Sequence, residues 1–358
     1  MDELLRTANK GEWSELYVFL KIMLERTLYA ADEDLQPKTD EWFRFIKLHR
    51  QLQNGNIQTF DLSNEGIVII SQTGNSTTYS TLDLGEKTHR IFNRIKQGAA
   101  TFVVEDAAAL MSEYGINSIK AKSTSKSDID AEVQVSNSPS RHKMGFSIKS
   151  YIGALPTLVN SSSHTNFVYE VTGFTGAFDE INSIEGKSKV RDRIAKIVEN
   201  GGKLSFTNMQ SEQFKQNLRM QDSAYPKVMA KMLLDFYSGK GNSLATLGQL
   251  ASQDTTLDMT ENEIQIATKR YLRSSALGMV PSREWSGKIS AQGGYIVVLE
   301  TGELVCYNIY FDDDFQAYLY ANTRFDTPST SKYDFGKLYE QGGKIYFKLN
   351  LQVRFKAV

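Results

Sequence analysis

Two neighbouring stretches of the sequence decide the fold: SKSDIDAEVQV at residues 125–135 and, after nine further residues, GFSIKSYIG at residues 145–153. In the first stretch, apolar and polar side chains alternate along residues 129–135. Such alternation is typical of a strand that buries one face. The second stretch alternates in the same way, with Ser147 and Lys149 on its polar face. A polar connection joins the two stretches, so the pattern predicts two strands joined as a hairpin.

Acidic side chains gather on the polar face of the first predicted strand. Asp128, Asp130 and Glu132 stand at every second position, so a strand would point them to one side of the sheet. If the two strands pair, an acid and Lys149 converge at one end of the sheet. Carboxylates hold Mg²⁺, and a lysine beside the metal can orient or deprotonate a water molecule, which together suit phosphodiester hydrolysis. The alternative interpretation is a solvated acidic face with Lys149 as its ion-pair partner.

The rest of the sequence predicts helices on both sides of this hairpin and strands towards the end. Apolar residues at helical spacing predict helices over residues 11–28, 86–97, 104–114, 189–199, 210–237 (interrupted near Pro226) and 260–276. Runs rich in β-branched and aromatic residues predict strands over residues 66–70, 295–300, 304–310, 317–325 and 344–355, the last four as an antiparallel-looking sheet. This order predicts an α+β fold, with a mixed sheet flanked by helices and with appended helical and antiparallel strand elements.

Composition is that of an ordinary globular protein. Hydrophobic residues make up 41% and charged residues 23% of the 358 residues. The net charge of −1 gives no sign of the general basicity of non-specific nucleic-acid binders. The single cysteine, Cys306, excludes a disulfide framework within the chain and favours a cytoplasmic location. The polar start and the short apolar runs predict neither a signal peptide nor a membrane span.

The hairpin carries a motif that resembles one found in known nucleases. Lys126-Ser127-Asp128-Ile129, followed after the polar connection by Phe146-Ser147-Ile148-Lys149-Ser150, is similar to the K-x-D-I … S-x-K form of the PD-(D/E)XK motif. Further stretches resemble the HpaII restriction endonuclease family, so that the resemblance covers nearly the whole chain. They are GEWSELYVFLK (residues 11–21), IGALPTLVNSSSHTNF (residues 152–167), NTRFDTPSTSKYDFGKLYE (residues 322–340) and LNLQVRF (residues 349–355).

This resemblance implies a restriction-endonuclease-like core and Mg²⁺-dependent cleavage of duplex DNA at the palindrome CCGG. It implies that Asp128 binds the metal and that Lys149 acts on the attacking water. The sequence departs from the motif at Ser147, where the family usually has a second acid. A hydroxyl is a poorer metal ligand than a carboxylate, so either water and phosphate oxygens complete the metal site or another acid does.

Two acids are candidates for the missing ligand, and a third could replace Asp128. Glu15 is the first, because the amino-terminal helix of such folds packs beside the site and often carries a glutamate. Glu12, on the same predicted helix, is the second candidate. Asp130 could exchange roles with Asp128, because a strand points both residues the same way.

Candidate DNA contacts follow the hairpin. Short hydrogen-bonding side chains suited to phosphate and base contacts are Asn160, Ser162, His164 and Asn166, although a capped turn explains them equally well. Arginine reads guanine and a carboxylate accepts from cytosine in the major groove. Side chains of these types in the later, locally basic segments are Arg270, Arg273, Arg324 and Asp326.

We expect residues 1–180 to form the nuclease core and residues 181–358 to form a helical region and a terminal sheet with the DNA-recognition part, unless the whole chain is one domain. Two rival functions stay open: a DNA-binding module whose nuclease site has decayed at Ser147, and a nuclease acting on RNA or branched DNA. Retention of both Asp128 and Lys149 argues against decay, and the lack of net basicity disfavours indiscriminate binding. A palindromic site is cut symmetrically either by a homodimer or by a monomer that nicks each strand in turn.

Overall fold

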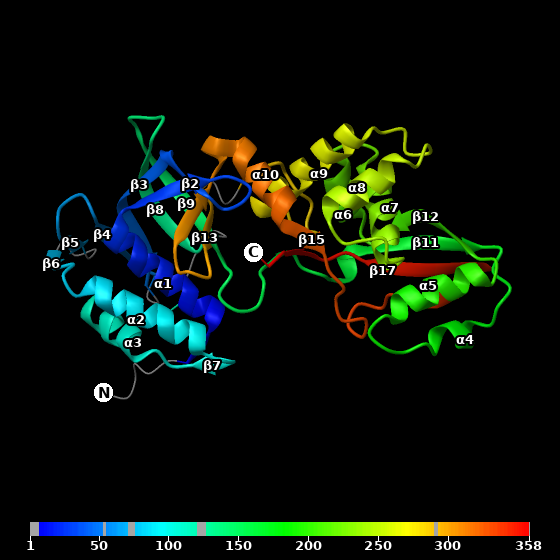
Figure 1. Cartoon of the computed structure of the whole chain (residues 1–358), viewed down its shortest axis with the longest axis horizontal. Coiled ribbons are helices and arrows are strands. Elements are labelled where there is room, and N and C mark those ends of the chain that lie inside the picture. The colour runs from blue at the N-terminus through cyan, green and yellow to red at the C-terminus, as the bar shows by residue number, and fades with distance from the viewer. Residues whose placement is uncertain (1–6, 53–54, 71–75, 120–126, 290–292, 358) are drawn as a thin grey trace. The chain divides into compact units, whose positions relative to one another are not determined.

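The computed structural model of the chain describes residues 7–52, 55–70, 76–119, 127–289 and 293–357 (Figure 1). These residues form two compact units. The first unit comprises the described residues of Met1–Pro156, Ile289–Tyr318 and Ala357–Val358, and the second comprises Thr157–Lys288 and Leu319–Lys356. The chain therefore leaves the first unit at residue 156, builds most of the second, returns to the first over Ile289–Tyr318, and then completes the second up to Lys356.

This division differs from the boundary predicted at residue 180. The short strand β10 (Thr157–Val159) pairs with β18 (Val353–Phe355), so residues 157–180 belong to the second unit. Conversely, β13 (Gly294–Val298) pairs with β9 (Arg141–Ser150) and so belongs to the first. Both departures come from pairing between segments far apart in sequence, which a local pattern does not reveal.

A mixed sheet forms the centre of the first unit. Among the described residues it has nine strands, in the order β2-β14-β13-β9-β8-β3-β4-β5-β6. The strands not yet defined are β2 (Thr27–Ala31), β3 (Pro37–Gln51), β4 (Ile57–Asp61), β5 (Ile67–Ile70), β6 (Ser76–Tyr79), β8 (Ile129–Val135) and β14 (Leu304–Tyr307). The mixed sheet predicted from the sequence is confirmed.

Two strand pairs of this sheet are parallel. β13 runs parallel to β9, beside which Figure 1 shows it, and β14 runs parallel to β2. The pairs β8–β9, β3–β8 and β13–β14 are antiparallel, and β3 pairs with β2 as well as with β8 and β4. The sequence predicted that the strands after residue 295 belong to an antiparallel sheet. This prediction is wrong for the pairing of β13 with β9, which is parallel.

The hairpin of β8 and β9 forms as the alternating pattern predicts. Ile129 pairs with Phe146, and both side chains are buried. Gly145 lies opposite Asp130, at a position where an added Cβ would come within 2.7 Å of the Ser127 Cβ. The chain segment just before β8 therefore packs directly against β9, and only glycine leaves room for that approach.

Helix α1 (Lys10–Glu25) packs against β9 and against α2 (Leu84–Gln97), which in turn packs against α3 (Glu105–Glu113). A capping box between Asn9 and Glu12 fixes its start. Its buried stripe contains Trp13, Leu16, Phe19, Leu20 and Met23. The helix ends earlier than the predicted residue 28, because Arg26 is left-handed and the following residues form β2. Two short strands, β1 (Ala8–Asn9) and β7 (Thr101–Phe102), pair beside it.

The second unit contains two smaller sheets and several helices. One sheet has the order β12-β11-β17-β16 and the other β10-β18-β15 among the described residues. Their strands are β11 (Asn166–Thr172), β12 (Lys203–Met209), β15 (Thr323–Phe325), β16 (Leu338–Gln341) and β17 (Lys344–Asn350). The helices are α4 (Phe178–Asn182), α5 (Lys189–Glu199), α6 (Glu212–Arg219), α7 (Tyr225–Tyr237), α8 (Leu244–Ser252) and α9 (Glu261–Ala276). The appended helical and antiparallel elements are thus confirmed.

One predicted strand, residues 317–325, is wrong over most of its length. The chain forms helix α10 (Asp312–Asn322) there, and only β15 at its end is extended. Aromatic residues favoured a strand, but Phe315, Tyr318 and Leu319 are buried at helical spacing. Three aspartates in the first turn also suit the positive end of a helix dipole.

Candidate active site

Asp128 does not lie on β8 but in the bend immediately before it. Its backbone N–H donates to the carbonyl oxygen of Phe146 at 2.8 Å. Its carboxylate oxygen Oδ2 accepts a hydrogen bond from the backbone N–H of Ile148, also at 2.8 Å. Two bonds to β9 therefore hold the Asp128 carboxylate beside the strand that carries Lys149. Lys126, the first residue of the quoted motif, lies outside the described residues.

Lys149 lies near the end of β9 with a half-buried side chain. Its ammonium nitrogen stands 4.8 Å from the centroid of the Tyr295 ring on the neighbouring strand β13, a cation–π distance. Burial lowers the pKa of Lys149, and the negative charges of Asp128 and Glu15 oppose that shift. The charges of two carboxylates, Asp128 and Glu15, thus both act on this one lysine.

Glu15 reaches this cluster from helix α1. The hydroxyl of its neighbour Ser14 donates to the hydroxyl of Ser150 at 2.9 Å, which ties the helix to the end of β9. The charge of Glu15 also acts on Arg50, whose pKa burial lowers to about 10 while Glu15 raises it. Glu12 has a different task, because its carboxylate accepts from the N–H of Asn9 in the capping box. Of the two glutamates named from the sequence, Glu15 is the one in electrostatic contact with Lys149.

The other acids of the hairpin do not join the cluster. Asp130 is exposed, and its Oδ1 accepts from the hydroxyl of Ser127 at 2.6 Å. Glu132 forms an ion pair with Arg141 at 3.4 Å. The expectation that three carboxylates share one strand face therefore needs correction, because Asp128 precedes the strand. Ser147 is half-buried on β9, opposite Tyr295 in the parallel pairing.

The donor set of this cluster fits a magnesium ion. Mg²⁺ prefers oxygen ligands and is usually held by one or two carboxylates, with water and substrate phosphates completing its shell. Asp128 and Glu15 supply two such carboxylates from different elements. Over the parts of the chain that are described, no group of three or more His, Cys, Asp and Glu residues forms a metal cage. The cluster therefore suits a metal that is shared with a phosphate-bearing substrate rather than a fully protein-bound one.

Two of the predicted DNA contacts make hydrogen bonds within the protein. Asn166 is fully buried, and its amide donates to Gln210 and to the carbonyl of Tyr333. The amide of Asn350 donates to Asn166 and to the carbonyl of Ser162. The Ser162 hydroxyl caps a short 3₁₀ helix, Ser163–Thr165. For these residues the capped-turn interpretation describes the structure, because their polar atoms bind the protein itself.

The remaining candidates occupy the surface of the second unit. Asn160 and Arg270 are exposed, and His164 and Arg273 are half-buried. Both arginines lie on α9, whose capping box at Thr260 confirms the predicted start of that helix.

Arg324 lies on β15 and Asp326 follows that strand directly. A third charged residue, missed from the sequence, joins them: Arg354 on β18 pairs with Arg324 across the two strands. The Nε of Arg354 stands 3.2 Å from the Asp326 carboxylate. No local signal marks Arg354, because only the pairing of distant strands brings it here.

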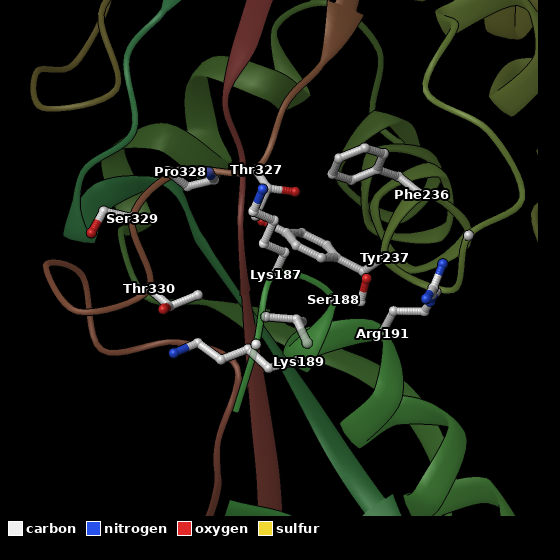
Figure 2. Close-up of a pocket in the computed structure, with 13 residues that line it drawn as sticks. Lys187, Ser188, Lys189, Arg191, Phe236, Tyr237, Thr327, Pro328, Ser329 and Thr330 are labelled. Atoms are coloured by element: carbon white, nitrogen blue, oxygen red, sulfur yellow. The ribbon is translucent and has the colours of Figure 1, made fainter. Parts of the chain in front are cut away.

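Sequence reasoning also missed a basic pocket of about 510 Å³ in the second unit. Figure 2 shows its walls, formed by the start of α5, the end of α7 and residues 327–330. Lys187, Lys189 and Arg191 line it together with the hydroxyls of several serines and threonines, and no acid is among the described residues that line it. The alternation of basic residues in EGKSKVRDR, residues 185–193, is the signal that could have found it. This charge and these donors suit a phosphate group.

The comparisons with known proteins agree over nearly the full length. Residues 9–355 match the family model described as HpaII restriction endonuclease. The chain is 33% identical over 356 residues to the Type II restriction enzyme HpaII of Haemophilus parainfluenzae, which covers 98% of each sequence. No solved structure matches the chain. Within the described residues, every helix is too short or too polar to cross a membrane.

Proposed function

The chain belongs to the HpaII restriction endonuclease family, and from this premise we propose that it cuts duplex DNA at the palindrome CCGG with Mg²⁺ as cofactor. As a member of the family, the protein is a site-specific deoxyribonuclease. The observation that carries the proposed chemistry is the hydrogen bond that holds the Asp128 carboxylate on β9, the strand of Lys149, where the charges of Asp128 and Glu15 both act on the lysine. It joins the two charges that phosphodiester hydrolysis needs: carboxylates for a metal, and a cation for the reacting phosphate.

Each residue of the cluster has a defined task in this proposal. Asp128 and Glu15 hold the metal, and the backbone bond from Ile148 keeps the Asp128 carboxylate in place. When bound, Mg²⁺ neutralises charge on the scissile phosphate and lowers the pKa of a water molecule. Lys149 orients that water for in-line attack and stabilises the charge that develops on the phosphate. The Tyr295 ring positions the lysine ammonium group.

The rival function, a DNA-binding protein with a decayed nuclease site, rests on Ser147 alone. Loss of one acid is compatible with activity when a second carboxylate comes from another element, as Glu15 does here. Retention of Asp128 and Lys149 in mutual electrostatic contact favours catalysis. Symmetric cleavage of a palindrome then requires either a homodimer or successive nicking by a monomer.

Cleavage of a plasmid of known sequence tests the proposal directly. We expect discrete fragments in the presence of Mg²⁺ and intact plasmid with EDTA. Sequencing of the fragment ends should place every cut at CCGG. Cuts at another motif would contradict the proposed specificity but not the nuclease function, whereas an uncut plasmid that nevertheless carries CCGG would favour the decayed-site alternative.

Glu15→Gln should raise the Mg²⁺ concentration needed for half-maximal cleavage. The expected increase is on the order of 10- to 100-fold, the range for residues that tune a metal site. The matched control is Glu12→Gln on the same helix turn, because glutamine preserves the capping box and Glu12 already binds Asn9. Titration of cleavage with Mg²⁺ and calorimetric Mg²⁺ binding measure the effect. A larger effect of Glu12→Gln than of Glu15→Gln would reverse the assignment.

A further inference from the structure

Two arginines stand opposite each other on one face of the small sheet β10-β18-β15. β15 and β18 are antiparallel, and Arg324 is the direct partner of Arg354. Their neighbours on both strands, Thr323, Phe325, Val353 and Phe355, are buried. Because side chains alternate along a strand, the two arginines point together away from this buried face. Both arginine side chains remain half-exposed.

This arrangement concentrates positive charge. Like charges directly opposite on neighbouring strands destabilise a sheet. The charge of Arg324 also lowers the pKa of Lys356, after the larger effect of burial. One acid partly compensates: Asp326 forms an ion pair with Arg354, and its backbone N–H donates to the carbonyl of Gln352 at 3.1 Å. Within the described structure, the buried Nε atoms of Arg324 and Arg354 both lack a hydrogen-bond partner, so the contact of Arg354 with Asp326 is an ion pair without a hydrogen bond from this atom.

We propose that Arg324 and Arg354 read two successive guanines in the major groove, and that Asp326 positions Arg354 instead of accepting from cytosine. The inference rests on the proposed function and names the residues of its specificity. Each guanine offers O6 and N7 to one arginine. Opposed residues of an antiparallel pair lie about 4.5–5.5 Å apart at Cβ. That separation lets two long side chains reach neighbouring bases about 3.4 Å apart along a strand.

The position of Asp326 distinguishes a base from a phosphate as the ligand. A carboxylate beside an arginine repels a phosphate, which carries a full negative charge, more strongly than the acceptor edge of guanine, which carries no net charge. The same carboxylate forms an ion pair with Arg354 and so favours one placement of its guanidinium group, which bidentate recognition requires. The basic pocket of Figure 2 has three cations and no acid among its described lining residues, although Lys189 and Arg191 pair with Glu185 and Asp192 outside that lining. What distinguishes the arginine pair is its place on two neighbouring strands, which sets two guanidinium groups at a spacing suited to adjacent bases.

Binding of duplexes with altered guanines tests the pair. Asp128→Ala provides a background in which DNA is bound without being cut. The probes are a duplex with one CCGG, the same duplex with 7-deazaguanine (which lacks N7) at either guanine, and an unrelated duplex. We expect Arg324→Ala and Arg354→Ala each to weaken binding to CCGG by about 5- to 150-fold, the range for one bidentate contact. For each variant, 7-deazaguanine at one of the two guanines should no longer change the affinity, whereas 7-deazaguanine at the other guanine should still weaken binding.

Arg90→Ala is the matched control. Arg90 is an exposed arginine of helix α2 that is paired with an acid, Asp106, at 2.9 Å and belongs to no site described above. It should leave the response to 7-deazaguanine unchanged. If the Arg324 and Arg354 variants weaken CCGG and unrelated duplexes equally and flatten the salt dependence, both arginines contact phosphates and the inference is wrong. If the background protein shows no preference for CCGG at all, the proposed specificity fails and the inference fails with it.

Asp326→Asn separates positioning from base reading. As a positioning residue, Asp326 acts through Arg354, so the variant should weaken the discrimination that Arg354 provides and leave the other guanine contact intact. In the double variant with Arg354→Ala, Asp326→Asn should cause no further loss of binding to the CCGG duplex. Additive loss in the double variant would show that Asp326 contacts a base itself. Thermal unfolding of each variant checks that the sheet still folds.

Discussion

Replacing Lys149 with alanine is expected to lower the rate of DNA cleavage by about 10²–10⁴-fold, the contribution typical of a group that manages a proton at the reacting centre. The ammonium is the cation that stands in electrostatic contact with both Asp128 and Glu15, and burial has already lowered its pKa. Without this ammonium group, no positive charge from the side chain orients the attacking water or stabilises the negative charge that develops on the phosphate. Binding of CCGG duplex should change little, because the residues proposed to read bases lie elsewhere. Single-turnover cleavage, with binding measured separately, distinguishes the two effects.

Lys143→Ala is the matched control for this variant. Lys143 lies on the same strand, is exposed, and pairs in register with Glu132 rather than with the cluster. It should cut at the wild-type rate. Lys149→Met removes the charge but keeps an apolar chain that can pack against the Tyr295 ring. This variant is used if the alanine variant is unstable. A methionine variant that folds and cuts at near the wild-type rate would remove Lys149 from the mechanism.

The elements with strong local patterns were predictable from the sequence. Alternation along residues 129–135 placed β8 correctly, because its apolar residues all face the core. Helical spacing placed α5 at the residues observed, Lys189–Glu199. The same reasoning failed at residues 317–325, where aromatic composition outweighed helical spacing although the structure forms α10.

The site could be predicted only as far as its local part. Asp128 and Lys149 could be named as candidates because they belong to one hairpin. The selection of Glu15 over Glu12 depended on the resemblance, and the reason for it became visible only in the structure, where Glu12 belongs to the capping box. Arg354 was missed because its partner Arg324 lies on a strand distant in sequence. Pairings of this kind, like the return of β13 to the first unit, are determined by tertiary packing.

Asp128→Asn should reduce cleavage by at least about a thousandfold, because losing an anionic metal ligand costs several kcal/mol in the transition state. Asparagine retains the shape of the side chain and an oxygen that can still accept from the Ile148 N–H, so the bend before β8 should persist. The variant is expected to bind CCGG duplex while cutting it very slowly, and extra Mg²⁺ should restore only part of the rate.

Asp130→Asn, two residues on, tests whether the two aspartates exchange roles. Asp130 is exposed and bound to Ser127, so this control should cut normally. If Asp130→Asn abolishes cleavage and Asp128→Asn does not, the metal ligand lies on the strand itself and the cluster described here is not the catalytic one.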